Sequence, residues 1–125
     1  MSEFIYKDYS SNLKFGEHTF NMPLNENMAD IIDKSFDSSL IQRKCETIDD
    51  LDNWYNDLLD AIDKVLGVGA ADKIMERFAH PGVMEVMSVI NYITTEWRNA
   101  YGELVEEIKK TTPQPNRATR RAKRR

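Results

Sequence analysis

The sequence predicts a mainly α (α+β) fold: a short N-terminal β-hairpin followed by about four helices, with a disordered basic C-terminal tail. Near the start of the chain apolar residues alternate, and from residue 25 to about residue 110 they recur at helical spacing. The last 13 residues hold six basic side chains and no acidic one. A length of 125 residues suffices for one hydrophobic core and does not require a second domain.

We therefore divide the chain into four segments. Residues 1–11 are expected to be a flexible N-terminal segment, and residues 12–24 a β-hairpin. Residues 25–112 are expected to form a helical domain, and residues 113–125 a Pro-linked, Arg-rich tail.

The hairpin is predicted from the stretch LKFGEHTFNMPL, in which apolar residues flank a Gly-Glu turn at every second position. Pro23 must lie at an edge or a strand end, because it has no N–H to donate to a ladder. Two strands alone are marginally stable in water. The hairpin must therefore lie on helices or pair with another subunit.

Helical spacing begins after Asn25, and the apolar residues of this first helix predict an end near Cys45. The second helix has a clearer start, because Thr47 followed by Asp50 fits a capping box. Gly67 is its natural C-terminal stop. A third, shorter helix is expected in VGAADKIMERFAH.

The last helix has the longest apolar stripe and is expected to run from about residue 81 to about residue 110. At 1.5 Å per residue it would span roughly 45 Å, whereas a compact body of this size is only about 35 Å across. Either Gly102 marks a kink or an end, or the distal part of the helix protrudes and packs on another chain. We favour the second alternative, because a protruding apolar stripe would otherwise be exposed.

No pattern in the sequence predicts an active site, a metal site or a cofactor. His18, His80 and Cys45 do not have the spacing of metal ligands. The Asp-rich segment TIDDLDNWYNDLLDAIDK lacks the Gly and the Glu of a calcium-binding loop, and its apolar stripe is that of an uninterrupted helix. We therefore expect a protein that is not an enzyme.

The charge is divided unequally along the chain. Residues 1–112 carry all 21 acidic and 11 of the 17 basic residues, a net charge of −10, and the remainder carries +6. An acidic body is repelled by phosphate, so nucleic acid could be bound only through the tail. No apolar stretch is long enough to cross a membrane, no signal peptide is recognisable, and the single cysteine fits a reducing compartment, so we expect an intracellular protein.

The tail has a regular arrangement of its own. Two prolines make residues 111–115 a stiff linker, and five arginines then recur at the spacing of one helix face. Like charges would keep so short a helix unfolded in isolation, and it would fold on contact with an anionic partner. The basic residues of the tail are Arg117, Arg120, Arg121, Lys123, Arg124 and Arg125.

The order of these parts resembles the tail assembly chaperone family of long-tailed (siphovirus-type) bacteriophages. The resemblance rests on LKFGEHTFNM, on the stretch from VLGVGAADKIMERF to INYITTEW, and on the Arg-rich end. It implies a non-enzymatic role in which the protein binds and solubilises the tape measure protein and aids assembly of the tail tube protein around it. It also implies residence in the host cytoplasm, absence from the mature virion and, in many members, a longer frameshifted form.

Our first hypothesis is therefore an assembly chaperone that binds a partner helix and is itself a homo-oligomer. Its tail would be a secondary contact. The alternative is an RNA-binding regulatory protein that uses the C-terminal arginine-rich motif. The residues predicted to contact the protein partner are Trp97, Tyr101, Leu104, Val105 and Ile108.

Overall fold

The computed structural model describes residues 3–111 and confirms the mainly α fold with an N-terminal hairpin. The tail predicted to be disordered, residues 113–125, lies outside the described residues. In chain order the elements are β1 (Ser10–Phe15), β2 (His18–Pro23), α1 (Glu26–Ser35), α2 (Ser38–Ile41), α3 (Ile48–Leu66), α4 (Ala70–Met75) and α5 (Val83–Thr111).

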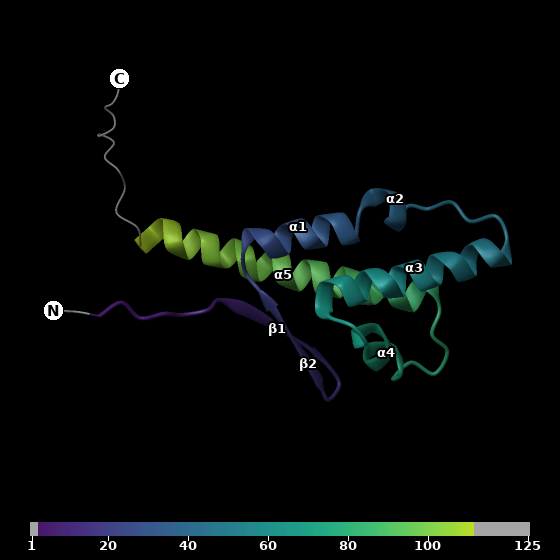
Figure 1. The fold of residues 1–125 in the computed structure, drawn as a ribbon, viewed down its shortest axis with the longest axis horizontal. Coiled ribbons are helices and arrows are strands. Elements are labelled where there is room, and N and C mark those ends of the chain that lie inside the picture. The colour runs from purple at the N-terminus through teal and green to yellow at the C-terminus, as the bar shows by residue number, and fades with distance from the viewer. Residues whose placement is uncertain (1–2, 112–125) are drawn as a thin grey trace, which may run out of the picture.

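The core lies where the hairpin, α3 and α5 meet. Helix α5 runs along most of the molecule and packs on α3 and β1, α1 packs on α3, and the hairpin crosses below (Figure 1). No side chain on α1, α2 or α4 is among the largest that are fully buried. Those side chains come from both strands, α3 and α5: Leu13, Met22, Leu58, Ile62, Val86 and Ile93.

The two strands pair antiparallel, with Phe15 opposite His18 and Ser10 opposite Pro23. The strands begin earlier than the predicted hairpin, because β1 starts at Ser10. Gly16 is the first of the two turn residues and has φ +63°, the conformation that glycine supplies in a type II′ turn. The sheet rests on helices of its own chain, so one of the two predicted ways to stabilise it is realised.

The first predicted helix is divided into two, and the expectation that it continues to near Cys45 is wrong. Helix α1 ends at Ser35, and the side chain of Asp37 accepts a hydrogen bond from the Leu40 N–H at 2.9 Å. Asp37 thereby caps α2, a single turn. Short polar side chains such as Asp compete with the helix for backbone N–H groups, and here that competition breaks the helix in spite of its apolar spacing.

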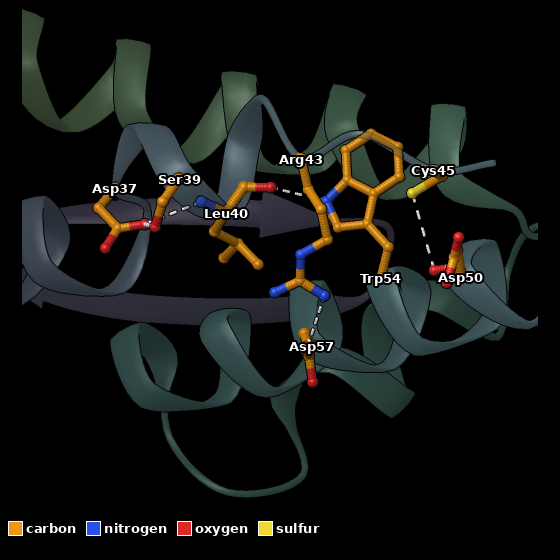
Figure 2. Close-up of polar contacts among 8 residues, drawn as sticks. All are labelled: Asp37, Ser39, Leu40, Arg43, Cys45, Asp50, Trp54 and Asp57. Atoms are coloured by element: carbon orange, nitrogen blue, oxygen red, sulfur yellow. Dashed lines mark hydrogen bonds and ion pairs between the residues drawn. The ribbon is translucent and has the colours of Figure 1, made fainter.

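The segment after α2 is fastened to α3 by side chains (Figure 2). The indole Nε1 of Trp54 donates to the Leu40 carbonyl at 2.7 Å, and Arg43 pairs with Asp57 at 2.7 Å. These contacts hold an irregular segment that has few backbone hydrogen bonds. The half-buried Trp54 therefore stabilises the link between α2 and α3.

The predicted capping box of α3 is confirmed. Thr47 accepts from the Asp50 N–H at 3.1 Å, and the Asp50 carboxylate accepts from the N–H groups of Glu46 and Thr47 at 3.1 and 3.2 Å. These backbone donors, that of Glu46 first, lower the pKa of Asp50 below its usual value, because they stabilise the charged form. The helix ends before Gly67, as predicted.

Helix α5 continues through Gly102 without interruption for 29 residues. Its length of roughly 43 Å at 1.5 Å per residue exceeds the diameter of a compact body. Of the two alternatives left by the sequence, an end of the helix at Gly102 is excluded. The C-terminal end of α5, drawn in yellow, projects beyond the start of α1 (Figure 1).

Replacement of Gly102 by alanine is expected to raise the free energy of unfolding by about 0.5–1 kcal/mol. An added Cβ would meet nothing within 4 Å, and alanine loses less backbone entropy than glycine on forming a helix. Urea titration followed by circular dichroism measures the change. A decrease in stability would mean that this turn of α5 is not helical in solution.

Candidate interaction surface

Trp97 lies in the protein's own core, so the prediction that it faces a partner is not realised in this structure. Its side chain is 4% exposed, and its Nε1 donates to the Pro23 carbonyl at 2.8 Å. Its ring stacks on Tyr101, with 4.8 Å between the ring centroids. Trp97 therefore joins α5 to the end of β2.

Beyond Trp97 the apolar face of α5 becomes progressively more exposed. Tyr101 is half-buried and still packs on the core, Leu104 and Val105 are partly exposed, and Ile108 is 50% exposed. We call these four residues the distal stripe. Their spacing of i, i+3, i+4 and i+7 places them on one face of the helix. Four of the five predicted partner residues thus form one partly exposed surface.

The opposite face of the same helical segment is polar. A shallow hollow there is lined mainly by charged side chains, with Asn99 and Gly102 between them. The distal stripe is therefore an apolar band on an otherwise charged projection. The charged residues of the hollow are Arg98, Glu103, Glu106, Glu107 and Lys110.

The residues considered for chemistry form no reactive cluster in the described part of the chain. His18 lies 3.1 Å from Glu76 and joins the hairpin turn to the end of α4. The Cys45 thiol donates to the Asp50 carbonyl at 3.7 Å (Figure 2). Within residues 3–111, no three His, Cys, Asp or Glu side chains are grouped so that they could hold a metal ion.

One apolar surface was missed by the sequence reasoning. Residues 3–9, which we call the N-terminal arm, have no helix or strand assignment, and Phe4, Ile5 and Tyr6 are 77%, 82% and 90% exposed. The signal was present, because three consecutive large apolar residues are unusual in a flexible polar end. The arm is attached at its base, where the Leu24 N–H donates to the Tyr9 carbonyl at 2.9 Å.

The six basic residues of the tail, from Arg117 to Arg125, lie outside the described residues, so the structure does not place them relative to the distal stripe. Among the residues described, no helix has the length and apolar character needed to cross a membrane. Comparisons with protein-family models, with curated proteins and with solved structures found no match to this chain.

Proposed function

We propose that this protein is a non-enzymatic assembly chaperone that binds an amphipathic helix of a longer partner chain along the distal stripe. One observation carries the proposal: α5 projects beyond the body of the domain (Figure 1), and its apolar residues continue along the projecting part as the distal stripe. A protruding, partly exposed apolar face is typical of a protein-binding surface rather than of a monomer's surface. A helix is its natural ligand, because side chains at i, i+3, i+4 and i+7 pack into another helix of the same spacing.

The resemblance to phage tail assembly chaperones supplies the identity of the partner in this proposal. The tape measure protein would be bound while it is extended and exposes apolar helix faces, and the tail tube protein would then assemble around it. The chaperone would act in the host cytoplasm and leave before the virion is complete. Burial of apolar surface along the stripe would supply the affinity, and the charged opposite face would keep the complex dispersed.

The test is co-expression with a tape measure protein, sought as the product of a long reading frame beside the gene, comparing wild type with a Leu104→Asp, Val105→Asp double variant. The wild type is expected to keep the partner in the supernatant and to co-purify with it. The double variant should retain at least about tenfold less partner, since loss of central apolar anchors costs about 2 kcal/mol or more in binding. Because both residues lie outside the core cluster, the variant should remain folded.

Asn99→Asp is the matched control, because it adds negative charge to the same segment of α5 at an exposed position on the polar face. It should leave co-purification unchanged. If the control and the double variant lose equal amounts of co-purified partner, the loss is a general charge effect and contradicts the proposal. Failure of the wild type to bind or solubilise the long protein would contradict it as well.

RNA binding through the arginine-rich tail is the second candidate, favoured by the sequence spacing of five arginines, which is that of one helix face. Binding of RNA hairpins should then survive competitor RNA and weaken steeply with salt. Loss of all binding at about 150 mM salt would leave only nonspecific attraction and exclude this candidate.

A further inference from the structure

The outer edge of β1 is open. The bond from the Leu24 N–H to the Tyr9 carbonyl extends the ladder and shows which β1 residues face β2. Backbone groups alternate between the two edges of a strand, so Asp8, Ser10, Asn12 and Lys14 direct their N–H and C=O groups away from β2. Within residues 3–111, no hydrogen bond is formed to these outward backbone groups.

The two edges of this small sheet differ. On β2 the outward carbonyl of Pro23 is bonded by Trp97 and Pro23 has no N–H. This edge is therefore closed at its end and open only at Thr19 and Asn21. On β1 the edge has no proline, and no side chain from a helix in the described part of the chain donates a hydrogen bond to it. An unprotected edge is a template for an additional strand, and a two-stranded sheet gains most from one.

The charges at the two ends of the open edge suit a second copy of the same chain. Asp8 lies at one end and Lys14 at the other, both exposed, with Ser10 and Asn12 between them. If two such edges pair antiparallel about Ser11, each Asp8 lies opposite a Lys14, and each Ser10 opposite an Asn12. Opposite charges placed across neighbouring strands stabilise the pair, and no like charges meet in this register.

The same register gives the N-terminal arm a place to bind. In its own chain the arm leaves the sheet at the end far from the turn (Figure 1). In an antiparallel neighbour this direction is reversed, so the neighbour's arm would pass the Gly16 turn of the first copy. A groove of about 400 Å³ lies beside that turn, between the hairpin, α4 and α5. Its apolar lining consists of Phe15, Ile74, Phe78, Val89 and Tyr92.

We propose that two copies of this chain associate through their β1 edges to form a four-stranded antiparallel sheet, with each arm inserted in the other copy's groove. Phe4 and Ile5 of one copy would enter the groove of the other copy, which is not occupied by that copy's own arm. The sheet hydrogen bonds give the register, and the apolar arm gives most of the affinity. This association uses a different surface from the distal stripe and does not depend on the proposed function.

Sedimentation equilibrium on the full chain tests this inference by charge reversal. The wild type is expected to be a dimer. Because the Asp8–Lys14 pair occurs two times in the symmetric dimer, Asp8→Lys and Lys14→Asp each create two pairs of like charges across the interface. Each variant should weaken dimerisation at least about tenfold. The double variant Asp8→Lys, Lys14→Asp restores the opposite pairs and should return to within about threefold of wild type. Both residues are exposed, so the hairpin should remain intact.

A second variant tests the arm. Phe4→Ser with Ile5→Ser should weaken the dimer at least about tenfold, whereas Ile48→Ser, at a position 77% exposed on α3, should not. A monomeric wild type at about 100 μM, or a dimer that neither reversal weakens, would overturn the inference. So would a dimer that is lost with Leu104→Asp and retained with Asp8→Lys, because the distal stripe would then be the dimer interface.

Discussion

Replacement of Trp97 by alanine is expected to lower the free energy of unfolding by about 3–5 kcal/mol. The indole is 4% exposed, stacks on Tyr101 and bonds the Pro23 carbonyl, so its removal leaves a cavity and a carbonyl without its donor. Urea titration followed by far-ultraviolet circular dichroism measures the loss. The effect should be among the largest of any single substitution, because the residue joins the last helix to the first sheet.

Trp97→Phe separates the two contributions. Phenylalanine keeps much of the packing and removes only the donor, so the loss should be smaller, about 1–3 kcal/mol. If Trp97→Ala instead costs under about 1 kcal/mol and mainly impairs partner binding, Trp97 would be exposed in solution. The original prediction from the sequence, that Trp97 faces a partner, would then be restored.

Replacement of Gly67 by alanine is expected to cost about 1–3 kcal/mol, although the added methyl group has room. A Cβ at Gly67 would meet nothing within 4 Å, so no clash is involved. The cost comes from the backbone, because φ 114° and ψ 156° belong to a region that only glycine occupies readily. Thermal unfolding followed by circular dichroism should show the loss as a lower midpoint.

Gly69 provides the matched control two residues later. It has φ 88° and ψ −7°, a left-handed conformation that asparagine tolerates. Gly69→Asn should therefore cost less than Gly67→Ala, under about 1 kcal/mol. A Gly67→Ala protein as stable as wild type would mean that the α3–α4 connection adopts another conformation in solution.

The parts of the fold that could be predicted from the sequence are those determined by neighbouring residues. The turn at Gly16, the capping box of Thr47 and Asp50 and the stop at Gly67 each depend on a few adjacent positions. The break at Asp37 was missed because the apolar spacing of Phe36 and Leu40 fits one continuous helix. Periodicity does not show whether a polar side chain will bond a backbone N–H instead.

Long-range roles could not be predicted. Asp63 belongs to the Asp-rich segment of α3, yet it is half-buried and accepts from the Ala71 N–H at 2.8 Å, which caps α4 from outside that helix. Trp97 belongs to the same stripe as Val105, and the sequence alone does not show where along a helix the core ends. The distal stripe was predicted as a pattern, whereas its boundary depends on how far the rest of the fold reaches along α5.

The hydrogen bond between Trp97 and Pro23 spans 74 positions in the chain, and this has a consequence for synthesis on the ribosome. Leu13 lies on β1, which packs on α5, so it is covered only when α5 is available. A nascent chain therefore carries an incompletely covered hairpin until nearly all of the domain has been translated. Folding should be late and concerted, and a message truncated before α5 should give a product that aggregates through its first strands.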